Sequence, residues 1–350
     1  MLRVGIIGCG KIAELRHAPE YLENPNAEIA GFWCYQDVPR AESFAKRFGG
    51  RAYETVKDML GDPTIDAISM CAANTFHAQT TVDALKMGKH VLCEKPMATT
   101  LEDCQRMADT ARETGKVLML GHNQRFAKAH VAAKEMILAG RIGRPLSFIT
   151  TFGHPGPEGW TGQKNSWFFS KDDAVFGVLG DLGIHKVDLI HYLLDDPIVS
   201  VSAVMDTLDK TYPDGTKINV EDNALCQFET LGGVLGTMQV SWTYYAREDN
   251  STRIYGTLGT LRLYDDPEYS LILETKGGKQ EKLALDLLTS NKEQTTGKRT
   301  NTGVIDAFVD AVLTGRRSRI DGDEALKAMK VIFAAQEAAS KGQKVQIHQV

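Results

Sequence analysis

The sequence predicts two domains, the first a parallel α/β domain and the second an α+β domain with a mostly antiparallel sheet. Up to Gly121, short apolar segments alternate with longer amphipathic ones, which is typical of βαβ units. After Gly121, strand-like segments recur without regular helices between them. The length of 350 residues fits two domains, which we place at 1–122 and 123–350.

In the first domain, apolar runs and helical spacing define the expected elements. We expect strands over Leu2–Ile7, Glu28–Tyr35, Ile65–Cys71, Lys89–Cys93 and Lys116–Gly121. We expect helices over Lys11–Leu22, Arg40–Phe48, His77–Met87 and Leu101–Thr114. Pro19 predicts a kink or an early end of the first helix.

In the second domain, strands predominate. We expect them over Pro145–Phe152, Ile198–Thr207, Ala224–Glu229, Val234–Tyr245, Arg253–Tyr255, Thr260–Leu263 and Leu271–Glu274. Gly232-Gly233 predicts a hairpin. We expect helices over Phe126–Ala139, Val304–Leu313 and Glu324–Ser340, and a surface loop over the polar stretch Thr289–Asn301.

Composition and charge exclude several classes of protein. The 43% hydrophobic and 24% charged residues exclude a disordered chain, a collagen-like fibre and a coiled-coil rod. No run of about 18 apolar residues occurs, so we expect no membrane partner. The 40 basic and 45 acidic residues give a net charge of −5, so we expect no nucleic-acid partner. Six cysteines without a CxxC pair, and an N-terminus without signal-peptide features, predict a cytoplasmic protein.

A GxGxxA sequence, Gly8-Cys9-Gly10-Lys11-Ile12-Ala13, follows the first strand and opens a helix. Gly8 permits the tight turn, Gly10 lets the backbone approach a pyrophosphate, and Ala13 lets helix and strand pack closely. The helix start at Lys11 and Ile12 offers N–H groups to an anion. The alternative is an ordinary strand–helix turn. In this βαβ setting the pattern predicts dinucleotide binding.

The end of the second strand is expected to hold the ribose of the cofactor. An acid there would bind the 2′-OH of NAD, but Tyr35 occupies the expected place and Asp37 comes slightly late. Arg40 could meet the 2′-phosphate of NADP or lie on the helix surface. Tyr35, Gln36 and Arg40 are therefore candidate cofactor contacts, and the choice between NAD and NADP stays open.

Three further segments complete a recognisable set: Ala72-Ala73-Asn74-Thr75-Phe76-His77, Cys93-Glu94-Lys95-Pro96 and Gly180-Asp181-Leu182-Gly183-Ile184-His185. With the GxGxxA start, the chain resembles the glucose–fructose oxidoreductase / inositol dehydrogenase (Gfo/Idh/MocA) family over nearly its whole length. The resemblance implies an N-terminal Rossmann domain followed by a large, mostly antiparallel open-faced sheet. It also implies that Ala72, Asn74, His77, Glu94 and Asn123 lie near the cofactor.

Lys95 follows a strand of the predicted parallel sheet, and ligands of such sheets bind off that edge. A lysine there would lie beside the nicotinamide, could hydrogen-bond the reacting hydroxyl and would favour its alkoxide character. The alternative for an isolated Glu-Lys-Pro sequence is a surface turn.

Asp181 and His185 are four residues apart on a predicted helix start and so share one face. The histidine can accept a proton at neutral pH, and the aspartate can orient its ring. The alternatives are a capping aspartate beside a core histidine, or a metal pair. Because no third ligand stands at plausible spacing, we expect no metal. The resemblance implies Lys95, Asp181 and His185 as the catalytic set, with either His185 or Lys95 as the proton acceptor.

The substrate pocket is expected to come from the second domain. The resemblance places Asn123 and Arg125 near a sugar. His154, Trp160 and Trp167 lie in the Gly/Pro-rich segment Gly153–Ser170, where an indole face can stack on a sugar ring. Core packing is the alternative for each aromatic side chain.

Together these features predict an NAD(P)-dependent dehydrogenase of a sugar, inositol or related polyol. One alternative is an NAD-dependent hydrolase of the same fold, which the missing export signal disfavours. Another is a non-catalytic sensor of cofactor and sugar, which the intact catalytic set disfavours. The resemblance also implies a homodimer or homotetramer formed through the second sheet, with the strand Val234–Tyr245 as a candidate contact.

Overall fold

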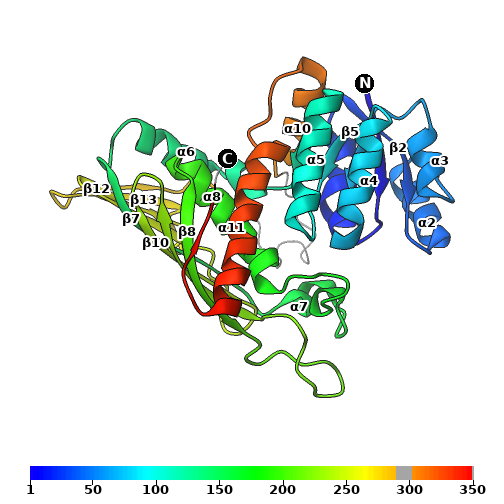
Figure 1. The fold of residues 1–350 in the computed structure, drawn as a ribbon. Coiled ribbons are helices and arrows are strands. Elements are labelled where there is room, and N and C mark those ends of the chain that lie inside the picture. Colours follow the sequence, from blue (N-terminus) through cyan, green and yellow to red (C-terminus); the bar gives the residue numbers. More distant parts are fainter. Residues whose placement is uncertain (289–301, 349–350) are drawn as a thin grey trace. The chain divides into compact units, whose positions relative to one another are not determined.

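The computed structural model describes residues 1–288 and 302–348 (Figure 1). It forms two compact units. The first contains Met1–Asn123 and the described part of Ser290–Leu326, and the second contains the described parts of Gln124–Thr289 and Lys327–Val350. The predicted loop Thr289–Asn301 lies outside the described residues.

The first unit is built on a six-stranded sheet with the strand order β3-β2-β1-β4-β5-β6, in which all strands are parallel. The strands are β1 (Leu2–Ile7), β2 (Ala27–Trp33), β3 (Arg51–Ala52), β4 (Ala67–Met70), β5 (His90–Cys93) and β6 (Leu118–Leu120). This is the order of the dinucleotide-binding Rossmann sheet. The predicted fold class of the first domain is confirmed.

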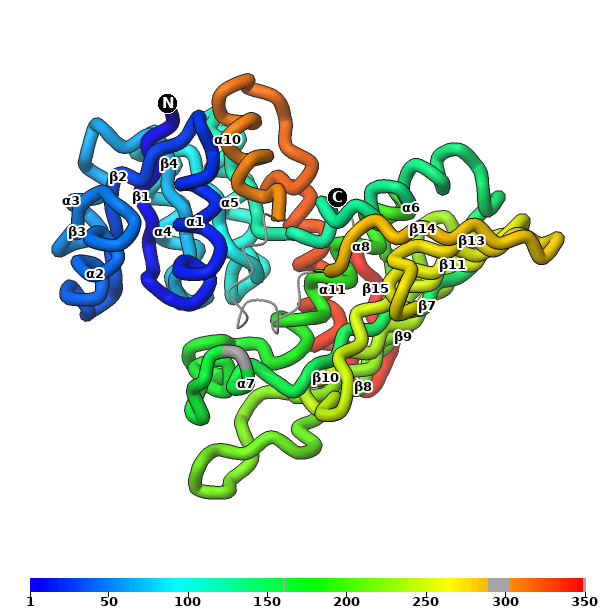
Figure 2. Tube along the Cα trace, turned by 180° about the vertical axis from the view of Figure 1, so that it is seen from behind, coloured from blue at the N-terminus to red at the C-terminus, as the bar shows by residue number. Residues whose placement is uncertain are grey.

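Helices cover both faces of this sheet, as a parallel sheet requires. Figure 1 shows α4 and α5 on one face, and Figure 2, from behind, shows α1 and α10 on the other. The helices are α1 (Ala18–Glu23), α2 (Val38–Phe48), α3 (Val56–Gly61), α4 (Asn74–Lys86), α5 (Leu101–Thr114) and α10 (Val304–Thr314). Local capping explains several starts: the side chains of Asp37, Thr55 and Thr100 each accept an N–H three residues on.

The first helical segment differs from the predicted one around Pro19. It continues to Glu23 and contains a π-helical turn, η1 (Ala13–His17), just before α1. The N–H of Ala18 donates to the carbonyl of Ala13, five residues back. Pro19 does not end the segment: it is the second residue of α1, directly after the π turn, and the helix runs on to Glu23.

The second unit is built on a nine-stranded sheet with the order β14-β13-β12-β11-β7-β10-β9-β8-β15. Only the β7–β10 pair is parallel among these described strands. The strands are β7 (Pro145–Gly153), β8 (Ile198–Asp206), β9 (Asn223–Thr230), β10 (Leu235–Ser241), β11 (Thr252–Gly256), β12 (Gly259–Leu263), β13 (Leu271–Thr275), β14 (Gln280–Leu283) and β15 (Val345–Gln346). The prediction of a mostly antiparallel sheet is confirmed.

The hairpin between β9 and β10 is confirmed, with Gly233 at φ +81° and its N–H on the carbonyl of Thr230. The strand predicted over Val234–Tyr245 is shorter than expected, because β10 ends at Ser241. One further backbone bond, from the N–H of Trp242 to the carbonyl of Asp222, follows the β9–β10 register past Ser241 before the pairing stops.

The longer helices of the second unit pack on one face of its sheet, through contacts of α6 with β12 and of α8 with β7. The helical segments are η2 (Asn123–Phe126), α6 (Lys128–Leu138), α7 (Pro157–Thr161), η3 (Trp167–Phe169), η4 (Leu179–Gly183), α8 (Ile184–Leu194) and α11 (Gly322–Lys341), of which η2 and α11 each begin in the first unit. Within the described residues, no helix combines the length and the apolar character that crossing a bilayer demands.

Candidate active site

In the first unit, the candidate residues follow strands that end at one edge of the parallel sheet. β1 ends at Ile7, β4 at Met70 and β5 at Cys93, and their registers pair these strands side by side. The Gly8 loop, the segment from Ala72 and the Glu94-Lys95 turn therefore emerge from neighbouring strand ends. This is the edge at which open α/β sheets bind their ligands.

The Gly8–Gly10 loop has the geometry that a pyrophosphate requires. Gly8 adopts φ +96°, and a Cβ there would lie 2.5 Å from the backbone nitrogen of Ala72. By contrast, a Cβ on Gly10 would meet nothing within 4 Å, so its absence leaves open space beside the helix start. Ala13 is fully buried, as close packing of helix and strand demands. The residues present therefore fit a bound dinucleotide: the backbone at Gly10, Lys11 and Ile12 would hold its phosphates.

At the end of β2, neither Tyr35 nor Asp37 offers a free carboxylate to the ribose of a cofactor. Tyr35 is 54% exposed, and its hydroxyl accepts a hydrogen bond from Gln36 Nε2 at 3.1 Å. The Asp37 carboxylate instead caps α2, accepting the N–H of Arg40 at 3.0 Å. Arg40 Nε donates to the carbonyl of Cys9 in the glycine loop at 2.5 Å. The side chain of Arg40 thus ties α2 to the loop rather than lying loose on the helix surface.

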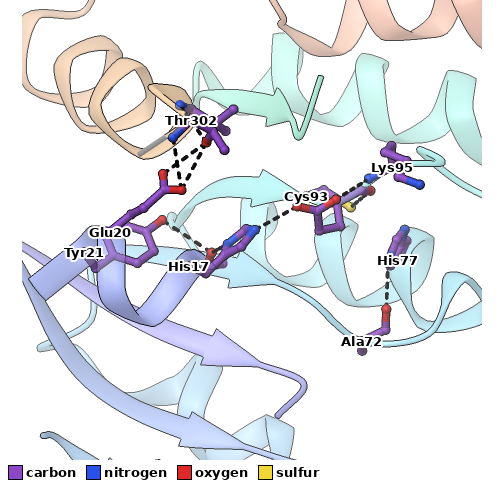
Figure 3. A network of polar contacts seen from close by, with 11 residues as sticks. His17, Glu20, Tyr21, Ala72, His77, Cys93, Lys95 and Thr302 are labelled. Atoms are coloured by element: carbon purple, nitrogen blue, oxygen red, sulfur yellow. Dashed lines mark hydrogen bonds and ion pairs between the residues drawn. The ribbon is translucent and has the colours of Figure 1, made fainter. Parts of the chain in front are cut away.

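His77 joins two of the predicted cofactor segments. It is 1% exposed, with Nδ1 2.8 Å from the carbonyl of Pro96 and Nε2 3.1 Å from that of Ala72. Burial lowers the pKa of His77. Asn74, at the start of α4, is also buried. The structure therefore brings Ala72, His77 and the Lys95-Pro96 turn together, with His77 as the link (Figure 3).

The Glu94 side chain is fixed beside the backbone of Lys95. One carboxylate oxygen accepts the Lys95 N–H at 3.2 Å, and the other lies 2.8 Å from His17 Nε2. A Cβ on Gly121, at the end of β6, would come within 2.9 Å of this carboxyl group. Only glycine at position 121 leaves room for it. Lys95 itself is half-buried.

In the second unit, Asp181 lies in the π-helical turn η4 that begins the helix of α8. It is 8% exposed, and its Oδ2 accepts the indole N–H of Trp242 at 3.1 Å. Trp242 is fully buried, as an indole with a satisfied N–H can be. Glu221 accepts the N–H groups of Gly177 and Leu179 at 3.0 and 3.1 Å, which caps the start of this helix.

His185 follows Asp181 on the same helix and is half-buried. Its ring centroid lies 6.0 Å from that of Phe152 on β7, and the ring of His154 lies 5.9 Å from the same Phe152. His154 is 3% exposed, and its Nδ1 accepts the N–H of Gly156 at 2.9 Å. The structure therefore gathers two predicted site histidines around one phenyl ring. No group of three or more metal-ligating side chains occurs among residues 1–288 and 302–348.

Lys186 and Arg125 make buried polar contacts next to these residues. Lys186 Nζ donates to the carbonyl of Asn250 at 3.1 Å and to Thr252 Oγ1 at 3.3 Å, and burial lowers its pKa to about 7. Arg125 forms a buried two-pronged ion pair with Asp188, at 2.9 and 2.7 Å. Its Nε and one terminal nitrogen are thus engaged within the protein. Asn123, two residues earlier at the start of η2, is half-buried.

The segment Gly153–Ser170 carries the two predicted tryptophans. Trp167, in η3, stacks on Phe168 with ring centroids 4.1 Å apart. Trp160 falls in α7, and its side chain lies outside the described part of the chain.

Two residues that contact the candidate site were missed by the sequence argument. His17 stands at a buried helix position, and Trp242 at the end of a strand. Neither stands out in the sequence, because His17 lies in the mixed stretch Glu14–Glu20 and Trp242 lies between Ser241 and Thr243. Only their burial in the structure shows that their ring nitrogens need partners.

Two models of protein families match this chain. The model of the "Oxidoreductase family, NAD-binding Rossmann fold" matches residues 2–122, and the "GFO/IDH/MocA C-terminal domain" matches residues 130–262. The chain is 28% identical over 355 residues to 1,5-anhydro-D-fructose reductase from Ensifer adhaerens, with 99% of each chain covered. It is 30% identical to inositol 2-dehydrogenase 3 from Saccharopolyspora erythraea, covering 75% of this chain and 73% of that protein.

Among solved structures, levoglucosan dehydrogenase in complex with NADH and L-sorbose is similar, with a TM-score of 0.85 at 25% identity. The match covers 100% of this chain and 99% of that one.

Proposed function

This chain belongs to the GFO/IDH/MocA family of NAD-binding oxidoreductases, and on that premise we propose that it is a dehydrogenase of a sugar, inositol or related polyol. The reaction moves a hydride between a nicotinamide and a secondary alcohol or its ketone. The relatives named above act, by their names, on an anhydro-sugar, an inositol and levoglucosan, and these set the class of substrate.

The observation that carries the proposal is the edge of the first sheet. There the open space at Gly10 follows β1 and the fixed Glu94-Lys95 turn follows β5, the two strands that flank β4 in one parallel sheet. A dinucleotide held by its phosphates at the first of these would extend along the strand ends that carry the second. When bound, the nicotinamide supplies the hydride acceptor or donor.

We propose Lys95, Asp181 and His185 as the catalytic residues. His185 would accept the hydroxyl proton, with Asp181 orienting it, and the Lys95 ammonium would stabilise the developing alkoxide. The alternative, with Lys95 as the proton acceptor, makes a different kinetic prediction. Only if His185 is the base does protonation of its ring cause the fall in rate at acid pH.

The second unit is proposed to supply the contacts to the sugar, through Asn123, Arg125, His154, Trp160 and Trp167. The ion pair of Arg125 with Asp188 supports a narrower role for Arg125, which would hold the η2 turn in place beside Asn123. His154 lies beside the same phenyl ring as His185, which supports its contact with the substrate.

We propose NAD as the cofactor, with only weak discrimination against NADP. The family description and the NADH complex of a similar structure support NAD. Discrimination would be weak because Tyr35 stands where an acid would repel a 2′-phosphate, and Asp37 is committed to capping α2. Comparing kcat/KM for the two cofactors tests this, and a preference for NAD above about a hundredfold, about 2.7 kcal/mol, would contradict it.

The test of the function is an initial-rate survey with NAD and NADP across inositols, aldoses, anhydro-sugars and their keto forms. The expected result is NADH formed in a one-to-one ratio with alcohol consumed, for at least one member. Cleavage of a glycoside without net NADH would favour a hydrolase instead. Cofactor and sugar binding without turnover across the survey would favour a sensor.

We propose that the chain forms a homodimer or homotetramer through the outer face of its second sheet. Alternation along β7, β8, β9 and β10 directs Ile149, Val204, Leu225 and Leu235 to one face, and these side chains are 46%, 72%, 53% and 59% exposed. Val204 and Leu225 pair directly across β8 and β9. Light scattering is expected to give a multiple of the chain mass, and a monomer mass at micromolar concentration would contradict the proposal.

A cytoplasmic location is proposed as well. All six cysteines are free thiols, which supports a reducing compartment. Fractionation of cells that express the chain tests this, and recovery outside the cytoplasm would contradict it.

A further inference from the structure

His17 reaches the candidate site from a helix that follows the glycine loop. It is the last residue of the π-helical turn η1, and its ring is 3% exposed. Nδ1 lies 2.7 Å from Ser69 Oγ, and Nε2 lies 2.8 Å from Glu94 Oε1 (Figure 3). Both ring nitrogens are therefore fixed by partners on two neighbouring strands, β4 and the end of β5.

The π turn η1 determines the direction in which the His17 side chain leaves the helix. In η1 the N–H of Ala18 bonds five residues back, so the turn is one residue wider than an α-helical turn. A wider turn changes the direction in which its last side chain leaves the helix. Single π turns of this kind occur often at functional sites.

The contact on Nδ1 is itself supported. Ser69 is fully buried on β4, and its hydroxyl oxygen accepts the Tyr21 hydroxyl at 3.4 Å. Tyr21 is fully buried in α1, one turn after His17. The imidazole ring thus cannot rotate without breaking a buried polar contact.

On the other side, the Glu94 carboxylate links the ring to the Lys95 backbone. Glu94 Oε2 accepts the Lys95 N–H while Oε1 contacts His17. Because Gly121 has no side chain, the carboxylate has room at this position. A displacement of His17 would therefore be transmitted over a single side chain to the backbone of Lys95.

The charges on this pair reinforce each other. Burial alone would lower the pKa of His17, but the neighbouring Cys71 and Glu94 raise it well above its ordinary value. Burial alone would raise the pKa of Glu94, but His17 and Lys95 lower it. The titratable and charged groups that face the pair from the surrounding elements include Arg16, Glu20, Tyr21, Cys71, His77, Cys93 and Lys95.

We propose that His17 is a positioning residue: its protonated ring holds the Glu94 carboxylate ionised against the Lys95 backbone and so sets the orientation of the catalytic lysine. The inference rests on the proposed role of Lys95 and adds a residue outside both the glycine loop and the Glu-Lys-Pro turn. On this proposal the π turn has a function, because it directs the His17 ring toward Glu94.

The first test uses the protein without cofactor or substrate. Nitrogen-15 NMR of the imidazoles is expected to show both nitrogens of His17 protonated from pH 6 to pH 8. Glu94→Gln is expected to return the His17 titration at least one pH unit toward its ordinary range and to shift the Lys95 amide resonance. A matched control is His90→Gln on β5, whose Nδ1 accepts the Val117 N–H away from the pair. A neutral His17 at pH 6 in the wild type, or no response to Glu94→Gln, would overturn the proposal.

The second test separates the two contacts of the ring by kinetics. His17→Gln keeps an N–H at the position of Nε2, and His17→Asn keeps one near Nδ1 only. If the Glu94 contact is what matters, His17→Asn is expected to lower kcat by about 10- to 100-fold, the range typical of outer-shell partners, with KM for the cofactor nearly unchanged. His17→Gln, which keeps the N–H to Glu94 but not the positive charge, is expected to lose less kcat than His17→Asn, and His90→Gln none.

Equal losses in His17→Gln and His17→Asn would overturn the positioning role. If no substrate supports turnover, the proposed function fails while the NMR test of His17, Glu94 and the Lys95 amide still decides the inference. If either variant fails to fold, Ser69→Ala provides a milder displacement of the same ring, expected to move the His17 and Lys95 resonances together.

Discussion

Each unit carries a helix that begins with a π turn, but the two hold their functional side chains by different forces. In the first unit, His17 of η1 faces the Glu94 carboxylate in a buried ion pair. In the second, Asp181 of η4 accepts a neutral indole N–H from Trp242. A buried ion pair is costly to break from one side, because the remaining charge is left without its partner. The comparison suggests that the first site depends on protonation state and the second on shape and a single donor.

The largest effect is expected from His185→Ala in the second unit. Loss of a general base lowers turnover by about 10²- to 10⁴-fold. Alcohol oxidation should suffer most at alkaline pH, where the wild-type imidazole is neutral and can accept a proton. The pH–rate profiles of wild type and variant measure this, and a uniform loss at every pH would shift the base role to Lys95.

The next effect is expected from Lys95→Met in the first unit. Removal of a charge that stabilises the developing alkoxide should lower kcat by about 10²- to 10³-fold. Binding of NADH, followed by its fluorescence, should be retained, because the glycine loop and not Lys95 holds the phosphates. Near-normal turnover in this variant would remove Lys95 from the mechanism.

A smaller effect is expected from Trp242→Phe, which keeps the ring and removes the donor to Asp181. Turnover should fall about tenfold, and unfolding should require about 1–3 kcal/mol less. Tyr264→Phe is the matched control in the same unit, because it also removes a hydrogen bond to a carboxylate, that of Asp286 at 2.6 Å. Stability should fall similarly in both variants. A kcat loss in Tyr264→Phe as large as in Trp242→Phe would mean that stability alone explains it.

The last effect concerns stability and not turnover, and it has opposite signs in the two units. Lys186 has its folded pKa lowered to about 7, whereas the unfolded chain keeps that proton to about pH 10.4. The unfolded state thus binds more protons between these values, so the contribution of Lys186 rises with pH there, by at most about 1.4 kcal/mol per unit. His17 has a raised folded pKa, so its contribution is complete below about pH 6.5 and declines as pH rises through the folded value.

Urea unfolding of wild type and Lys186→Met between pH 7 and pH 10 measures this contrast. The variant is expected to lose the rising part of the wild-type profile. The same slope in both proteins would show that Lys186 keeps its proton in the folded state.

Much of the fold followed from local sequence. The strands β1, β2, β4, β5 and β6 lie close to their predicted bounds because each is a short apolar run between turn signals. The short elements β3, α3, α7, β14 and β15 were not predicted, since two to six residues carry too little periodicity to distinguish them from loops. The segment over Lys11–Leu22 was predicted as helical, but its π turn was not, because no local pattern specifies a bond five residues back.

The sequence by itself determined the class of each domain and the glycine loop, because these depend on residues close together in the chain. Only the tertiary structure decided which buried polar groups meet: His17 and Glu94 are 77 residues apart, and Asp181 and Trp242 are 61 apart. The physical reason is that a buried donor or charge must find a partner, but the strand order and the helix turns select that partner. The sequence therefore indicates which polar side chains need a partner if they are buried, and the packing of distant strands decides which side chains become partners.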